Sequence, residues 1–333
     1  MVEAMLILAL GVVCLIAGGD VLIRGATRLA GRLGVPTYIV GLTVVAFGTS
    51  APELALNIIA ASGGNTGLSF GNIVGSNIAN IGLILGLSAL IRPMRVHASI
   101  IRREMPLMML ATLALVGMLY LPPDIAGASG VTRIDGLVLL VGFVLFCWML
   151  YRTAVAQGPS AAMLLTDPQA LEEAVEEASI PLSLVLCVLG AIGLAGGGKL
   201  AESGAVQAAQ WMGMSDELIG LTIVAIATSL PELAASLTAA VRRQSDLAVG
   251  NIVGSNIFNI LLVMGATSLV EPVRLPAQSA IALVSMVVLS LLLWPLSVTQ
   301  DRRVSRVEGS VLLTLYVATL TLSVWEAMRH SAG

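Results

Sequence analysis

Two glutamates in apolar stretches of the chain, Glu53 and Glu232, have the chemistry and the neighbours needed to bind a cation. The same three residue types precede each acid at the same spacing: Thr49, Ser50 and Pro52 in the first motif, and Thr228, Ser229 and Pro231 in the second. A carboxylate at the centre of a lipid bilayer costs about 2.5–3.5 kcal/mol on insertion scales, so two such acids require compensation. We predict that a bound cation provides it.

Further oxygen atoms lie close to these acids in the sequence. Each proline lacks the N–H that would bond the carbonyl four residues earlier, which frees the carbonyls of Gly48 and Ala227. A polar stripe at i, i+4 and i+8 follows each motif and shares one helix face: Asn72, Ser76 and Asn80 in the first case, and Asn251, Ser255 and Asn259 in the second. All of these groups offer oxygen ligands.

The donor set favours a hard cation. Calcium accepts about 6–8 oxygen ligands in a flexible geometry, whereas magnesium retains water and softer metals prefer sulfur or nitrogen. Two carboxylates balance one calcium ion, and sodium also accepts hydroxyl and carbonyl oxygens. The chain has three cysteines, each alone in an apolar run, and two histidines near segment ends. These counts argue against a disulfide, a zinc or haem site and a serine–histidine hydrolase.

The composition places these motifs in a membrane protein. Of the 333 residues, 57% are hydrophobic and 11% are charged, against roughly 25% charged in soluble domains, and the mean hydropathy is +0.96. So few charges cannot cover the surface of a soluble fold, so membrane lipid is the main solvent. A net charge of −3 and 4% aromatic residues leave no basic or stacking surface for nucleic acid.

Apolar runs of about the length of a bilayer predict an all-α polytopic membrane protein with ten transmembrane helices. The predicted helices lie near 4–30, 37–62, 67–91, 104–122, 134–154, 181–208, 217–241, 246–270, 277–297 and 307–328. Arginine falls mainly on one side of these helices, which predicts that this side is cytoplasmic and that both termini lie outside the plasma (inner) membrane. The polar interruption at 156–180 is predicted to be an acidic cytoplasmic linker.

The two motifs belong to an internal repeat with an offset of 179 residues. The sequence GLTVVAFGTSAPELALNIIAA begins at Gly41 and GLTIVAIATSLPELAASLTAA begins at Gly220. No gap is needed over this region, which indicates a duplication. Each half holds five predicted helices, so the second half enters the membrane from the opposite side. We therefore predict two inverted five-helix repeats, 1–155 and 181–333, with the substrate bound near the membrane midplane.

The same residues also fit simpler roles. Each motif fits a helix-capping box, in which Ser50 is the N-cap and Glu53 lies three residues later. The asparagine and serine stripes also fit hydrogen bonding between helices. The recurrence of both patterns beside paired acids favours ion binding. Four charges in the first and sixth helices are interpreted as structural or interfacial: Asp20, Arg24, Lys199 and Glu202.

At these motifs the chain resembles the cation/calcium exchanger superfamily, specifically its prokaryotic sodium/calcium exchangers. The resemblance rests on GTSAPE at Gly48–Glu53, ATSLPE at Ala227–Glu232 and the sequence GNIVGSNI at Gly71–Ile78 and Gly250–Ile257. It covers nearly the whole chain and implies that Glu53 and Glu232 ligate calcium, while sodium uses overlapping oxygens. It implies a further set of ligands, in which the two alanines offer main-chain oxygens: Thr49, Ser50, Thr228, Ser229, Ser76, Asn80, Ser255, Asn259, Ala46 and Ala225.

The resemblance implies a sodium/calcium antiporter that works by alternating access, without a cofactor or enzymatic activity. The first and sixth helices, which are long and interrupted by glycine, are candidates to slide against the rest. Asn259 departs from relatives that carry aspartate, which disfavours potassium co-transport. The alternatives are a proton-coupled exchanger of calcium or another divalent ion, and a cation channel. An intramembrane hydrolase using Ser50 or Ser229 is disfavoured because neither motif contains histidine or lysine.

Overall fold

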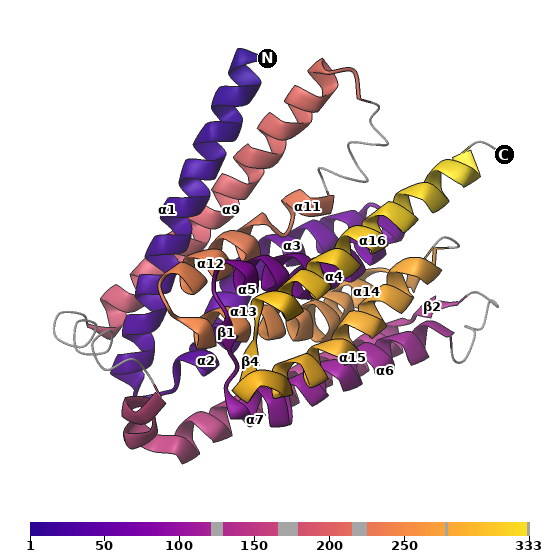
Figure 1. Cartoon of the computed structure of the whole chain (residues 1–333). Coiled ribbons are helices and arrows are strands. Elements are labelled where there is room, and N and C mark those ends of the chain that lie inside the picture. The colour runs from indigo at the N-terminus through magenta and orange to yellow at the C-terminus, as the bar shows by residue number, and fades with distance from the viewer. Residues whose placement is uncertain (121–128, 166–178, 215–224, 277–278, 332–333) are drawn as a thin grey trace. The chain divides into compact units, whose positions relative to one another are not determined.

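The computed structural model describes residues 1–120, 129–165, 179–214, 225–276 and 279–331. Helices form almost all of this part of the chain (Figure 1), which confirms the predicted all-α fold class. Eight of the described helices are long and apolar enough to cross a membrane, so the chain is a multi-pass membrane protein. They are Val2–Leu33, Thr37–Ser62, Thr66–Ile91, Arg133–Ala156, Ile180–Trp211, Ser245–Val270, Ala280–Thr299 and Arg306–Glu326.

Two predicted spans, 104–122 and 217–241, are not among these eight. The first corresponds to the π-helix η3 (Ile100–Glu104) followed by α6 (Met105–Tyr120), which has 16 residues. The second is described only from residue 225, as α11 (Ala225–Ala227) and α12 (Leu230–Val241), because residues 217–224 lie outside the described part. The count of ten helices therefore stays a prediction.

The chain forms two compact units. Unit 1 contains Met1–Ser50 and Cys147–Gly254, and unit 2 contains Ala51–Phe146 and Ser255–Gly333. Each unit therefore combines chain from both predicted repeats. Most of the predicted acidic linker lies outside the described residues, while its first part continues the helix α7 (Arg133–Leu165).

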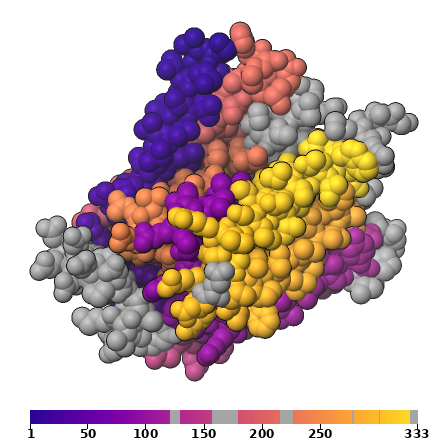
Figure 2. Space-filling view, viewed as in Figure 1, coloured from indigo at the N-terminus to yellow at the C-terminus, as the bar shows by residue number. Residues whose placement is uncertain are grey.

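Unit 1 is built around two 32-residue helices, α1 (Val2–Leu33) and α9 (Ile180–Trp211), which lie side by side in Figures 1 and 2. Glycine is required along their contact. A Cβ built on Gly11 would lie 2.3 Å from the Ala201 nitrogen, and one on Gly190 would lie 2.4 Å from the Leu22 nitrogen. Real Cβ contacts are never that short, so the small residues set how closely these helices pack.

Shorter elements of unit 1 pack against this helix pair. They include α2 (Thr37–Val40), the π-helix η1 (Gly41–Val45), the start of α3 (Ala46–Ser62) and α12. Helix α12 contacts both α1 and α9. Thr49 and Ser50 of the first motif and the whole second motif belong to this unit, so it contains part of the predicted site.

The 179-residue offset recurs in the boundaries of the structural elements. Helix α4 (Thr66–Ala79) continues through the π-helix η2 (Asn80–Leu85) and α5 (Gly86–Ile91) to strand β1 (Met94–Arg95). The second run starts 179 residues later and has the same lengths: α13 (Ser245–Phe258), η5 (Asn259–Met264), α14 (Gly265–Val270) and β3 (Val273–Arg274). The duplicated sequence thus folds into the same order of elements.

The rest of unit 2 consists of long helices joined by short strand pairs. Helices α15 (Ala280–Arg302) and α16 (Arg306–Ser331) flank β4 (Arg303–Val304), which pairs antiparallel with β1. Strand β2 (Gly130–Val131) pairs antiparallel with β3. Figure 2 shows α15 and α16 against each other, and α16 also packs on α5 and η2.

Candidate cation site

The first motif lies inside one continuous helix. Thr49, Ser50 and Glu53 belong to α3, and Pro52 lies within it. All three polar side chains are buried. Ser50 is a helix-interior residue, and its hydroxyl donates to Glu232 Oε1 at 3.1 Å. The interpretation of this motif as a capping box is therefore wrong for Ser50.

The second motif has a different backbone. Helix α11 ends at Ala227, Thr228 and Ser229 form a turn, and α12 begins at Leu230. Ser229 occupies the N-cap position of α12, but its side chain makes no capping hydrogen bond. Glu232 lies in the first turn of α12 and is fully buried. Ala225 lies in α11, so three predicted ligands, Ala225, Thr228 and Ser229, lie at this break.

A chain of hydrogen bonds in unit 1 links the two motifs to the second polar stripe. The Thr49 hydroxyl lies 3.2 Å from Asn251 Oδ1 and 3.2 Å from the carbonyl oxygen of Ala46, the predicted main-chain ligand. Asn251 Nδ2 in turn donates to Ser236 Oγ at 2.9 Å. These contacts, with that of Ser50 to Glu232, hold five oxygen-bearing side chains in fixed positions.

The corresponding group in unit 2 surrounds Glu53, which is 2% exposed. The Ser76 hydroxyl donates to Glu53 Oε1 at 2.6 Å. Asn57, one turn after the acid, donates from Nδ2 to the Glu53 carbonyl oxygen and to Asn72 Oδ1, both at 2.7 Å. Ser69 donates to the Asn57 carbonyl oxygen at 3.2 Å. The carboxylate and the backbone of Glu53 are thus both held by neutral donors.

Asn80 and Asn259 occupy equivalent places at the start of two π-helices, η2 and η5. Both side chains are buried, and neither amide has a hydrogen-bond partner within the described chain. π-Helical turns are rare and occur mostly at functional sites. Ser76 and Ser255 precede these asparagines by one turn, and both serines are buried. Buried amides without protein partners are consistent with atoms that bind an ion or water.

The grouped atoms are oxygens of carboxylates, hydroxyls and amides. No cluster of three or more histidine, cysteine, aspartate or glutamate residues occurs among the residues that the structure describes. Such a donor set suits calcium and sodium better than a transition metal.

Sequence analysis missed Asn57 and Ser236 as members of this network. They lie four residues after Glu53 and Glu232 and are separated by the same offset of 179 residues. Each bonds the first asparagine of a polar stripe, Asn72 or Asn251. A polar residue one turn after each acid was the signal that could have identified them.

Known proteins are similar to this chain over nearly their full length. Residues 3–152 and 182–325 match the protein family described as sodium/calcium exchanger protein. The chain is 41% identical over 320 residues to the putative antiporter CaxA of Alkalimonas amylolytica, covering 95% of this chain and 97% of the relative. It is 30% identical over 340 residues to the sodium/calcium exchanger MaX1 of Methanosarcina acetivorans, covering 95% and 97%.

Solved structures give the same result. The sodium-calcium exchanger NCX_Mj, soaked with 2.5 mM Na+ and 0.1 mM Ca2+, shares 32% sequence identity and a TM-score of 0.78 with this chain. The match covers 96% of this chain and 98% of that one. Both acidic motifs fall inside the residues matched to the family.

Proposed function

Because the chain belongs to the sodium/calcium exchanger family, we propose that it exchanges sodium for calcium across the membrane. One observation carries this proposal: two buried acids occupy the same position of a 179-residue repeat, and each accepts a hydrogen bond from a serine hydroxyl. The full-length similarity to MaX1 and NCX_Mj supports it.

In this proposal Glu53 and Glu232 are calcium ligands, and two carboxylates balance the charge of one calcium ion. Sodium ions use overlapping oxygens, so the two ions compete. The remaining ligands are the hydroxyl, amide and main-chain oxygens implied by the resemblance. The buried amides of Asn80 and Asn259, which lack hydrogen-bond partners in the described chain, support their inclusion.

The proposed mechanism is alternating access by two inverted five-helix repeats in the inner membrane, with both termini outside. Helices α1 and α9 move together relative to the ion ligands. The close glycine contacts between the two helices support a joint movement, because small residues let their backbones pack against each other along the contact. Only competing occupancy by calcium or sodium permits the change of state, which couples the two fluxes.

Calcium uptake into proteoliposomes, with and without an outward sodium gradient, tests the function. We expect uptake to require the gradient, and Glu53→Gln or Glu232→Gln to abolish it in protein that still inserts. At an effective dielectric of ~20, a unit charge at about 4 Å contributes on the order of 4 kcal/mol before desolvation. Uptake driven by a proton gradient instead would indicate the proton-coupled exchanger. Uptake without any counter-ion would indicate a channel.

A further inference from the structure

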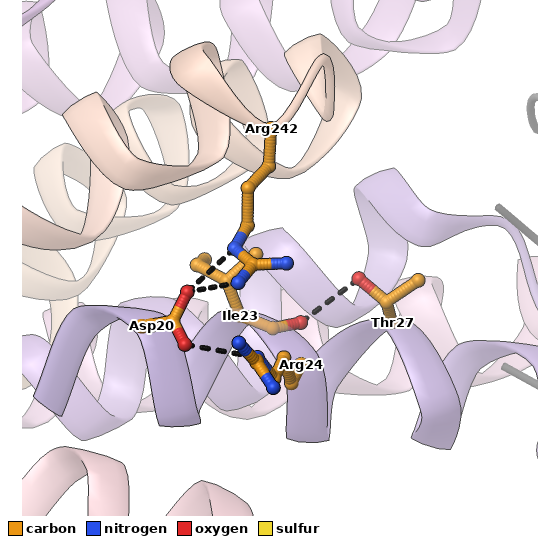
Figure 3. A network of polar contacts seen from close by, with 5 residues as sticks. All are labelled: Asp20, Ile23, Arg24, Thr27 and Arg242. Atoms are coloured by element: carbon orange, nitrogen blue, oxygen red, sulfur yellow. Dashed lines mark hydrogen bonds and ion pairs between the residues drawn. The ribbon is translucent and has the colours of Figure 1, made fainter. Parts of the chain in front are cut away.

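An ion-pair network joins α1 to the end of α12 (Figure 3). Asp20 lies on α1, and its Oδ2 accepts from Arg24 Nε at 2.9 Å one turn away. Its Oδ1 accepts from Arg242 Nε at 2.7 Å and also from Arg242 Nη2. The Asp20 side chain is 31% exposed and that of Arg242 is 36% exposed. One carboxylate thus binds two arginines from two helices.

Arg242 is rigidly connected to the proposed ion ligand Glu232. Arg242 is the C-cap residue of α12, and Glu232 lies in the first turn of the same helix. Ten residues of α-helix separate them by about 15 Å. The helix stops at Arg243, whose φ of 62° is left-handed, and Gln244 N donates back to the Ala239 carbonyl at 2.8 Å. A displacement of Arg242 along the axis therefore displaces Glu232.

The backbones of α1 and α12 touch beside the ion pair. A Cβ built on Gly19 would lie 2.9 Å from Thr238 Oγ1 and 3.2 Å from the Ala234 carbonyl oxygen. Thr238 and Ala234 both belong to α12. A slide of α1 by one helical turn, about 5.4 Å, would separate Asp20 from Arg242 beyond hydrogen-bonding distance.

The repeat provides this connection only once. The residues 179 positions from Asp20 and Arg242 are Lys199 and Gly63. Lys199 Nζ forms an ion pair with Glu202 Oε2 of its own helix α9 at 3.0 Å. Gly63 has no side chain that could form an ion pair with Lys199. An interaction present in one repeat and absent from the other stabilises one of two symmetry-related states over its counterpart.

We propose that Asp20 is a positioning residue for ion exchange: by binding Arg242 it latches α1 to α12 and favours the conformation seen in this structure. This rests on the proposed function, because the latch must open when α1 slides. Arg24 holds the Asp20 carboxylate from its own helix and so directs its second oxygen towards Arg242. Loss of the latch changes the population of the two states, and therefore the apparent ion affinity, without altering an ion ligand.

The test measures the distance between spin labels on cysteines introduced at Leu33 of α1 and Val241 of α12, both exposed, in protein lacking the three native cysteines. Asp20→Asn and Arg242→Gln should each move the distance distribution towards a second population. The doubly substituted Asp20→Arg, Arg242→Asp protein should restore the parent distribution. Glu202→Gln, which breaks an ion pair within one helix, is the matched control and should leave it unchanged.

Sodium-driven calcium uptake by the same variants supplies the second readout. For an ion pair of this exposure we expect the half-saturating calcium concentration to shift roughly 2- to 5-fold in the single variants and to recover in the charge-swapped protein. Parent-like distances and parent-like half-saturation in Asp20→Asn would overturn the latch. A charge-swapped protein as altered as the single variants would overturn it too. A different outcome would overturn the proposed function instead. In that outcome the variants change the label distances as expected, but the parent protein itself shows no sodium-driven calcium uptake.

Discussion

Replacing Ser76 with alanine is expected to weaken calcium binding more than replacing Ser50, although both serines donate to a proposed calcium ligand. Ser76 Oγ lies 2.6 Å from Glu53 Oε1, a separation typical of charge-assisted hydrogen bonds. Ser50 Oγ lies 3.1 Å from Glu232 Oε1, which is longer than such bonds. Hydrogen bonds to charged groups contribute about 1.5–3 kcal/mol, and ordinary ones contribute about 0.5–1.5 kcal/mol.

These free energies convert to affinities at about 1.4 kcal/mol per tenfold change. The half-saturating calcium concentration should therefore rise roughly 10- to 100-fold in Ser76→Ala and roughly 2- to 10-fold in Ser50→Ala. The assay is sodium-driven calcium uptake into proteoliposomes over a range of calcium concentrations. Ser88→Ala is the matched control, because it also removes a buried hydroxyl but lies on α5, about 18 Å further along the same helical run. Equal shifts in the two variants, or a Ser76→Ala protein that behaves like Ser88→Ala, would refute the reasoning.

Three further predictions concern packing, acid stability and site charge. Gly190→Ala should lower thermal stability, because the new methyl would lie 2.4 Å from the Leu22 nitrogen, whereas Gly196→Ala, with no described atom within 4 Å, should be neutral in the same melting experiment. Burial is the main cause that lowers the pKa of His97, and two nearby arginines lower it further. The stability that the neutral imidazole contributes to the fold is therefore fully present above about pH 6.5, and it is lost as pH falls through the folded-state pKa. Melting temperatures of His97→Asn against pH should show a shallower loss. Asn259→Asp adds a third acid, and exchange should persist at neutral pH but become more sensitive to alkaline pH; identical flux profiles would remove Asn259 from the ligand set.

The long helices and the repeat were predictable because each has a direct signal in the sequence. A bilayer requires a minimum apolar length, and α1, α4 and α13 all lie on runs of that length. The duplication preserved sequence identity without gaps, and the elements from α4 to β1 recur as α13 to β3 with identical lengths. The sequence order alone did not predict that each compact unit takes chain from both halves, since that depends on how the helices pack.

The hydrogen bonds of the site were not predictable in the same way. Ser50 and Ser229 occupy equivalent motif positions, yet one lies inside α3 and the other at the N-cap of α12. Both motifs contain proline at the same place, so proline alone does not decide whether the helix continues. Partners such as Asn57 and Asn72 lie on different helices, and the distance between helices is not encoded in residue spacing. The residue types of the site were therefore predictable, whereas their pairing was not.

The buried acids of the chain accept hydrogen bonds from donors of different kinds. Glu104 is fully buried, and its Oε1 accepts from Arg103 Nε at 2.8 Å, so a permanent cation of the protein neutralises it. Glu53 Oε1 accepts a hydrogen bond from the Ser76 hydroxyl, and Glu232 Oε1 accepts one from the Ser50 hydroxyl. A hydroxyl orients a carboxylate but leaves its negative charge in place, and a charge at that depth is costly without a counter-ion. Under the proposed function, a serine hydroxyl orients each acid without supplying the permanent positive charge that the Arg103 guanidinium gives to Glu104.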